Sequence, residues 1–246
     1  MEHPFFDSIK KFKKTGSTHK KAESLIKSRE ISGNFLLTAE TQTSGKGRKG
    51  NKWDSPEGGI WLSAGCYGLP VSSNLTVYTG IIIHRVLSRI LPESENKLKI
   101  KWPNDIYYDG KKLCGIIASC LSQQKYHVLG IGINTNFEIF DESIAENAVS
   151  TLQILNKKID NDELICKIFT EFSELLPEFV EKGLAPYLKY YAEKSFLINK
   201  KVELKTEFES YSGIALGINK KGALKIRLAG GMIQPFFGGT IVKTEN

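Results

Sequence analysis

The 246-residue chain lacks any apolar run long enough to span a membrane. No stretch approaches the roughly 20 consecutive apolar residues of a transmembrane helix. The N-terminus has no basic segment followed by an apolar one, so no secretory signal is expected. Low-complexity tracts are also missing, and hydrophobic residues make up 41% of the chain, which excludes a largely disordered protein.

Cysteine and histidine are scarce, with four of each, and both are scattered along the chain. No CxxC pair and no cluster with metal-ligand spacing is present, which argues against a zinc site. In a chain of this size the pattern predicts reduced, buried thiols and a cytoplasmic protein. The cysteines are Cys66, Cys114, Cys120 and Cys166.

Positive charge is unevenly distributed. Residues 1–53 contain 12 of the 34 lysines and arginines and 5 of the 27 acidic residues, which leaves 22 of each in the remainder. Such a region is either a solvated basic surface or a segment that meets an anion, such as a nucleotide or a nucleic acid. Charge alone leaves both interpretations open.

Hydrophobic periodicity predicts an α+β fold with a mixed or antiparallel sheet. Apolar residues recur at helical spacing in some segments and form short runs in others. Four expected strands follow one another without an intervening helix, which is typical of antiparallel pairing. Expected strands lie at residues 4–13, 35–39, 60–64, 98–101, 105–108, 112–120 and 126–134, and expected helices at 19–30, 74–91, 161–179 and 184–193.

The pattern changes after Lys194. Short apolar runs separated by glycine-containing turns are typical of a small β-barrel. We therefore expect two domains, at residues 1–194 and 195–246.

The loop at residues 42–52 has no apolar side chain and carries four cations within seven residues. Gly45, Gly47 and Gly50 match the letters of a dinucleotide-binding fingerprint, but no helix pattern follows, so that interpretation is rejected. A mobile glycine-rich backbone with cations can instead fold over a polyphosphate, and Trp53 can stack on a base. A disordered basic loop is the alternative.

A second informative segment is Lys101-Trp102-Pro103-Asn104-Asp105. Pro103 restricts the backbone, so the two following polar side chains are held in defined directions, although they can also be simple turn formers. Lys112 follows inside an otherwise apolar strand. It either needs a negative partner or extends its ammonium group to the surface.

Glycines also interrupt two expected strands. Gly130 and Gly132 alternate in one, and Gly115 lies in the other. Such strands present a flat slot to a planar ligand, or they are bulged or tightly packed.

Together these segments resemble the biotin protein ligase family. The match rests on three motifs in one order, namely Gly45–Gly50 with Lys52-Trp53, Lys101–Asp105 with Lys112–Ile116, and Gly130–Asn134. The tail also resembles the C-terminal SH3-like barrel of that family. The resemblance implies a catalytic domain similar to class II aminoacyl-tRNA synthetases, followed by that barrel.

The resemblance implies a two-step reaction with ATP, biotin and Mg²⁺. Biotin is first converted to biotinyl-5′-AMP, and a lysine of a biotin carboxyl carrier domain then displaces AMP. This corresponds to a biotin–[biotin carboxyl-carrier protein] ligase in its short form, without a DNA-binding domain. The family often forms homodimers, and neither DNA nor a membrane is an expected partner.

The resemblance also implies individual residue roles. Those implied in catalysis are Lys112, Arg48, Asp105 and Asn104, with Asp105 as the candidate Mg²⁺ ligand. Those implied in biotin binding are Ser17, Thr18, Gln42, Gly45, Lys46, Gly47, Arg48, Lys112, Gly115, Gly130 and Gly132. Those implied in ATP or adenylate binding are Arg48, Trp53, Asn104, Lys112 and Asn134. The chain departs from the family at Lys46, His19 and Thr240, where arginine, asparagine and glutamate are common.

Two other functions fit parts of the sequence. A lipoate–protein ligase shares the fold and the adenylate chemistry, but the Lys101–Asp105 motif argues against it. A nucleic-acid-binding protein can use the basic N-terminal region, but residues 10–30 contain a single aromatic residue, Phe12, whereas such surfaces interleave aromatics with cations.

We predict that the loop at residues 43–52 is mobile without ligand and becomes ordered over an adenylate, because its glycines and cations favour closure on phosphate. Limited proteolysis with and without biotin and ATP tests this. We expect slower cleavage within the loop when both ligands are present, and equal cleavage would contradict the prediction.

Overall fold

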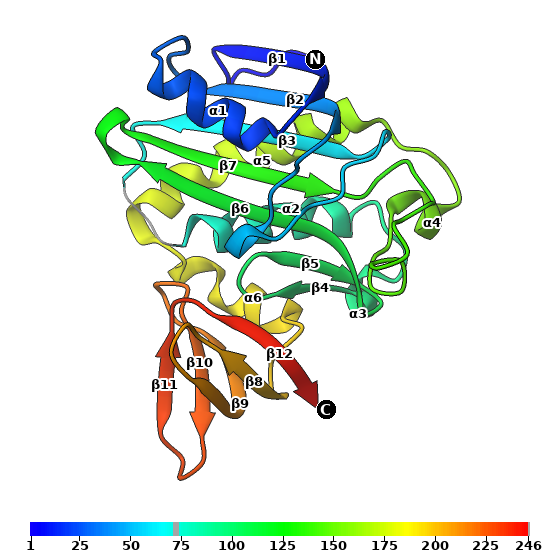
Figure 1. The fold of residues 1–246 in the computed structure, drawn as a ribbon. Coiled ribbons are helices and arrows are strands. Elements are labelled where there is room, and N and C mark those ends of the chain that lie inside the picture. Colours follow the sequence, from blue (N-terminus) through cyan, green and yellow to red (C-terminus); the bar gives the residue numbers. More distant parts are fainter. Residues whose placement is uncertain (71–73, 246) are drawn as a thin grey trace.

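The computed structural model describes residues 1–70 and 74–245. Its centre is a seven-stranded sheet in which β1 and β2 pair in parallel and all other neighbours are antiparallel (Figure 1). This confirms the predicted α+β fold with a mixed sheet. In spatial order the strands are β1 (Ser8–Thr15), β2 (Phe35–Gln42), β3 (Ile60–Tyr67), β7 (Tyr126–Ile133), β6 (Lys111–Leu121), β5 (Asp105–Tyr108) and β4 (Leu98–Lys101).

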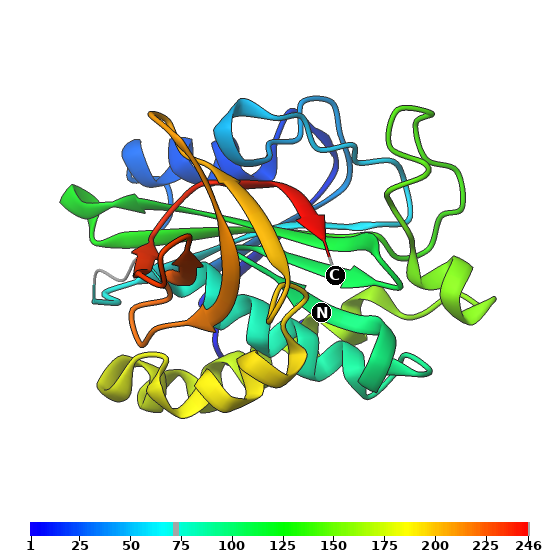
Figure 2. The same ribbon diagram turned by 90° about the horizontal axis from the view of Figure 1, so that it is seen from below.

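Helices cover both faces of this sheet. The long helices α2 (Leu75–Ser88) and α5 (Asn161–Lys182) pack on one face, and α1 (Thr18–Lys27) lies on the other (Figures 1 and 2). No helix in residues 1–70 or 74–245 is long and apolar enough to cross a bilayer. The short helices are α3 (Ser94–Lys97), α4 (Thr151–Leu155) and α6 (Leu188–Lys194), with single turns η1 (Arg48–Gly50), η2 (Ser122–Gln124) and η3 (Ala185–Tyr187).

A second, five-stranded antiparallel sheet follows the helices. It begins beside β4, where the backbone N–H of Phe196 donates to the carbonyl oxygen of Ile100 at 2.8 Å. The Trp102 indole N–H also donates to the carbonyl oxygen of Gly222 at 3.0 Å, which ties the two parts together. The expected C-terminal β structure is confirmed, and the domain boundary at residue 194 stays a prediction. In spatial order its strands are β11 (Ile233–Phe236), β10 (Leu224–Leu228), β9 (Ser210–Ile218), β8 (Lys201–Lys205) and β12 (Thr240–Glu245).

Differences from the predicted elements arise at their ends. β1 begins at Ser8 rather than at residue 4, because residues 4 and 5 form a turn. The short helix α4 was not anticipated. Ser150 caps it, since the Ser150 hydroxyl accepts from the Gln153 backbone while the Gln153 side chain accepts from the Ser150 backbone.

The expectation that the cysteines are buried is only partly correct. All four thiols are free, and Cys66 and Cys114 are buried. Cys120 is exposed, because it lies near the end of β6, beyond the part of that strand that pairs with β5. Cys166 is partly exposed, because it lies on α5 beside the core-facing stripe rather than in it.

His84 joins three elements inside the main core. Its imidazole is fully buried on α2, with Nε2 3.1 Å from the carbonyl oxygen of Leu98 and Nδ1 2.7 Å from the Tyr190 hydroxyl. A carbonyl only accepts, so Nε2 carries the proton and Nδ1 accepts from Tyr190. Burial lowers the pKa of His84 from 6.5 to about 4.

We predict that His84 makes the protein less stable in acid. The folded state keeps this imidazole neutral, so stability present above about pH 6.5 is lost as the pH falls toward 4. The loss amounts to about 3 kcal/mol. Urea unfolding at pH 7 and pH 4 should show a smaller difference for His84→Gln than for the wild type. The other histidines are present in both proteins, so identical pH dependences would contradict the role of His84.

Candidate active site

Strand pairing aligns one row of residues across the seven-stranded sheet. Trp61 is opposite Gly132, Gly132 opposite Gly115, Gly115 opposite Asp105, and Asp105 opposite Lys101. Directly paired residues share a face of a sheet. The row therefore brings two glycines, a carboxylate and an ammonium group side by side on one face.

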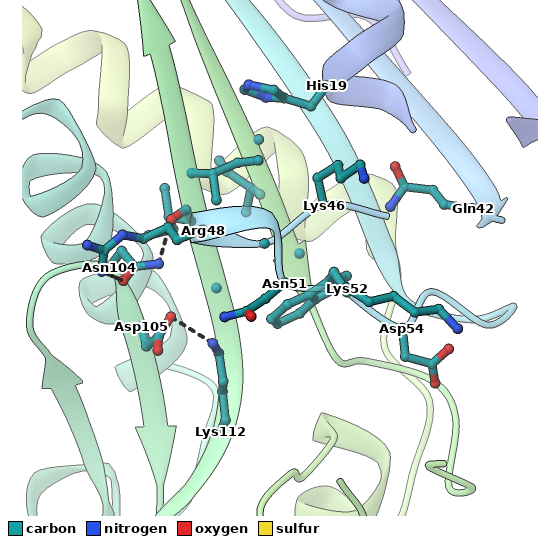
Figure 3. A pocket seen from close by; sticks show the side chains of 18 of the residues that line it. His19, Gln42, Lys46, Arg48, Asn51, Lys52, Asp54, Asn104, Asp105 and Lys112 are labelled. Carbon is teal, nitrogen blue, oxygen red and sulfur yellow. Dashed lines mark hydrogen bonds and ion pairs between the residues drawn. The ribbon is translucent and has the colours of Figure 1, made fainter. Parts of the chain in front are cut away.

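A cavity of about 540 Å³ lies over Gly132, Gly115 and Asp105 of this row, on the face that carries α1. Its wall is formed by the start of α1, the loop at residues 46–54, β6 and β7, the loop at residues 137–148, and Thr240. Figure 3 shows two of its polar pairs, Arg48 with Asn104 and Asp105 with Lys112, each joining side chains from separate elements.

One end of the cavity is a preorganised polar network. The backbone N–H and hydroxyl of Thr18 both donate to Gln42 Oε1, at 2.8 and 3.1 Å. The Ser63 hydroxyl donates to Thr18 Oγ1 at 2.9 Å, and Gln42 Nε2 donates to Ser55 Oγ at 2.9 Å. These bonds fix the orientation of the Gln42 amide before any ligand binds.

His19 extends this polar end. Its Nε2 lies 3.1 Å from Ser119 Oγ, and the Ser119 hydroxyl donates to Glu23 at 2.7 Å. Ser119 must therefore accept from His19, which leaves Nδ1 as an acceptor against Gly130. Nδ1 has no hydrogen-bond partner within the described part of the chain. Burial lowers the pKa of His19 and Glu23 partly offsets this, which favours the neutral imidazole near neutral pH.

The glycine slot is filled in part by the protein itself. A Cβ atom at Gly132 or Gly115 would lie 2.6 or 2.7 Å from the Trp53 indole, so the ring rests directly on these two glycines. Trp61 meets it edge-on, and Lys112 Nζ lies 5.1 Å from the ring centroid. The Trp53 indole therefore occupies the slot over Gly115 and Gly132, where a planar ligand was expected.

The other end of the cavity is charged. Lys112 Nζ lies 2.9 Å from Asp105 Oδ1, and both side chains are partly buried. Arg48 donates to Asn104 Oδ1 at 3.0 Å and to the carbonyl oxygen of Gly239 at 3.3 Å. Burial lowers the pKa of Arg48 and Asp105 partly offsets this, but a guanidinium remains charged in proteins. The arrangement can bind a phosphate group.

Of the residues expected to form the site, Gly45 does not line the cavity. Its carbonyl accepts from the Trp53 backbone at 3.0 Å, and a side chain there would collide with the Trp53 carbonyl oxygen. Gly45 therefore positions the loop. The Asn134 amide lines the cavity and donates to the carbonyl oxygens of Lys112 and Val149, which holds the loop beside β6.

Several lining residues were missed by sequence reasoning. Aromatic and aliphatic side chains in the loop at residues 137–148 form an apolar wall, and their presence in a polar loop was the available signal. The missed residues include Ser63, Asn51, Asp54, Phe137, Phe140, Ile144, Asn147 and Ala148.

The donor set fits a nucleotide-bound Mg²⁺ better than a resident metal. Within residues 1–70 and 74–245 no three His, Cys, Asp or Glu side chains converge. Mg²⁺ bound through nucleotide phosphates needs only one or two carboxylates, and Asp105 can supply one.

Comparison with known proteins finds family matches for both the N-terminal and the C-terminal part of the chain. Residues 12–136 match the model of the Biotin/lipoate A/B protein ligase family, and residues 197–243 match the Biotin protein ligase C terminal domain. The Bifunctional ligase/repressor BirA of Escherichia coli is 32% identical over 86% of this chain and 67% of its own length. The Biotin--[acetyl-CoA-carboxylase] ligase of Paracoccus denitrificans is 25% identical over 92% of this chain and 99% of its own.

The fold is similar to that of a solved structure over its full length. The biotin protein ligase from Aquifex aeolicus in complex with biotin and ATP has a TM-score of 0.84 and 28% identity. The match covers 98% of this chain and 99% of the other.

We predict that Gly132→Ala displaces the Trp53 indole, because the added methyl group would lie 2.6 Å from the ring. Iodide quenching of tryptophan fluorescence should increase in this variant and should not change when the substitution is made in a Trp53→Phe background. Gly80→Ala is the matched control, since its nearest contact is an ordinary 3.6 Å. Unchanged quenching in Gly132→Ala would refute the packing of Trp53 on this glycine.

Proposed function

The chain belongs to the biotin/lipoate A/B protein ligase family, and we propose that it joins biotin to a lysine of a carrier domain through a biotinyl-5′-AMP intermediate. The observation that carries the proposal is the cavity, which joins the polar network around Thr18 to the Lys112–Asp105 pair. Its volume of about 540 Å³ lies in the range of small-molecule sites.

Biotin occupies the polar end in this proposal. Its ring lies over Gly130, where Ser17 and Thr18 offer hydrogen bonds to the ureido group, and its acyl chain runs toward Lys112. The short polar side chains fix the orientation of the ring, and the glycine backbone allows it to approach the sheet. The other residues that we assign to biotin binding are Gln42, Lys46, Gly47 and Arg48. Gly115 and Gly132 lie under the Trp53 indole and are not assigned to biotin.

Adenylation takes place at the charged end. The biotin carboxylate attacks the α-phosphorus of ATP, and pyrophosphate leaves. Lys112 and Arg48 stabilise the negative charge on the phosphoryl oxygens, so catalysis consists mainly of positioning and electrostatic stabilisation. Trp53 stacks on the adenine, and Asn104 and Asn134 border the nucleotide.

The second step transfers the biotinyl group. The neutral acceptor amine attacks the carbonyl carbon of the mixed anhydride, the bond to the phosphate oxygen breaks, AMP leaves with the electron pair, and the nitrogen releases a proton to solvent. We assign to Asp105 the orientation of this amine, because its carboxylate is the one that contacts Lys112. Mg²⁺, when bound with ATP, neutralises phosphate charge, and Asp105 is the residue that would hold it.

The name of the Paracoccus relative supports a more specific acceptor. We propose the biotin carboxyl carrier domain of an acetyl-CoA carboxylase. The division of the chain at residues 194 and 195 and the cytoplasmic location are predictions of the same proposal.

Biotin-dependent exchange between pyrophosphate and ATP tests the function on the purified full-length protein. Exchange with biotin but not with lipoate would support it. Exchange only with lipoate would retain the mechanism but refute the substrate, and no exchange with either would refute the ligase activity.

We predict that Lys112→Ala slows adenylation by about two orders of magnitude or more, because one preorganised charge at the phosphoryl group is lost. Single-turnover release of pyrophosphate measures this rate. Lys111→Ala is the matched control, since Lys111 is exposed on the same strand. Pyrophosphate release at the wild-type rate from folded Lys112→Ala would exclude this role.

A further inference from the structure

A second group of cations lies next to Asp105, outside the residues that line the cavity, because Lys101 is paired with Asp105 across β4 and β5. Lys101 Nζ donates to the Tyr107 hydroxyl at 3.2 Å and lies 5.6 Å from the Phe196 ring centroid. Lys200 Nζ lies 4.3 Å from the same centroid. Two ammonium groups thus share one aromatic ring, and neither forms an ion pair with any residue that the structure describes. We call these four residues the Lys101 cluster.

The Lys101 cluster has an excess of positive charge. Burial lowers the pKa of Lys101, Asp105 partly offsets this, and the nearby Lys112 and Lys200 lower it further. Asp105 therefore interacts with several cations at once, because it also contacts Lys112 and acts on Arg48. Half-buried cations with too few carboxylates are stabilised by binding an anion.

Tyr107 is suited to the same ligand. Burial and the Asp105 charge raise the pKa of its hydroxyl to about 12, so it stays protonated. Its oxygen accepts from Lys101, which leaves the hydroxyl proton free to donate to an anion.

The position of the Lys101 cluster follows from strand register. Asp105 is paired with Gly115 on one side and with Lys101 on the other, and Tyr107 is paired with Lys112. Neighbouring strands are about 4.8 Å apart. A ligand that runs from the glycines of β7 to Lys112 on β6 and continues in the same direction reaches Lys101 on β4.

The in-line geometry of attack at the α-phosphorus places the leaving pyrophosphate on this side, toward Lys101. As the biotin carboxylate oxygen bonds to the α-phosphorus, the bond from the α-phosphorus to the bridging oxygen breaks. That oxygen leaves with the electron pair as part of pyrophosphate. Attacking and leaving oxygens lie in line, so pyrophosphate departs on the side opposite biotin.

We propose that Lys101, Lys200 and the Tyr107 hydroxyl bind the β- and γ-phosphates of ATP and the pyrophosphate that leaves. This inference rests on the proposed function, since it takes the direction of biotin and the identity of the leaving group from it. Lys101 and Lys200 are binding residues for the leaving group, and Phe196 holds both ammonium groups in place.

The test replaces each lysine by methionine, which keeps an unbranched apolar stem and removes the charge. Calorimetric titration of the full-length protein with magnesium pyrophosphate should show binding weakened at least about tenfold in Lys101→Met, as expected for a lost charge-assisted hydrogen bond. The KM for pyrophosphate in the exchange reaction should rise by a similar factor, and Tyr107→Phe should have a smaller effect.

Two controls separate binding from structure. Biotinyl-5′-AMP lacks the β- and γ-phosphates, so its affinity should be the same in Lys101→Met, Lys200→Met and the wild type. Lys99→Met alters the same face of the same strand two residues away, and it should leave pyrophosphate binding unchanged.

The outcomes are distinct. Equal pyrophosphate affinity in Lys101→Met and the wild type would overturn the inference, and so would an equal loss of biotinyl-5′-AMP affinity in Lys101→Met. Absence of biotin-dependent exchange in the wild type would instead refute the proposed function. The direct titration with pyrophosphate would still decide whether the anion site exists.

Discussion

The backbone register of the seven-stranded sheet is the constraint on which the site depends. Because paired residues share a face, the pairing of β7, β6, β5 and β4 alone sets Gly132, Gly115, Asp105 and Lys101 in one line. A slip of one residue would turn the Asp105 and Lys101 side chains to the opposite face, where α2 and α5 pack, and would move both glycines out of the line. The core on that face is therefore what holds the order of glycine, carboxylate and ammonium on the cavity side.

The glycine-rich loop at residues 42–52, with Trp53 at its end, adds an aromatic ring and a guanidinium group to the site. It carries Trp53 onto the bare glycines and Arg48 onto Asn104, and both side chains line the cavity. Arg48 also donates to the carbonyl oxygen of Gly239, and Lys49 donates to the Thr240 hydroxyl. The C-terminal part of the chain thus helps to hold the glycine-rich loop, and through this loop it contributes to the site on the seven-stranded sheet. Thr240 offers a neutral hydroxyl at a position where the family often has a carboxylate, so this link relies on hydrogen bonds.

The features that could be predicted from the sequence are those that neighbouring residues determine. The consecutive strands between residues 98 and 133 follow from short apolar runs, and the Asp109-Gly110 turn with positive φ at both residues fixes one hairpin. The motif around Asn104 and Asp105 is unusual in the sequence itself, because polar residues there interrupt apolar runs, and Lys112 directly precedes the apolar run of β6. Long-range contacts could not be foreseen. The seating of Trp53 on Gly115, the exposure of Cys120 and the apolar wall at residues 137–148 all depend on which segments meet in space.

Charge balance explains why one carboxylate serves so many cations. Asp105 contacts Lys112 and acts on Arg48 and Lys101, so in the ligand-free protein it partly compensates three positive groups. A phosphate chain brings its own negative charge and takes over that compensation, which releases the carboxylate from Lys112. In the proposed reaction, pyrophosphate then departs and one phosphate remains. Asp105 is free at the moment when an acceptor ammonium group must be attracted and oriented. A second carboxylate in the row would repel the phosphates. If the row held no carboxylate, Lys112 would have no partner. A single acidic residue therefore fits both half-reactions.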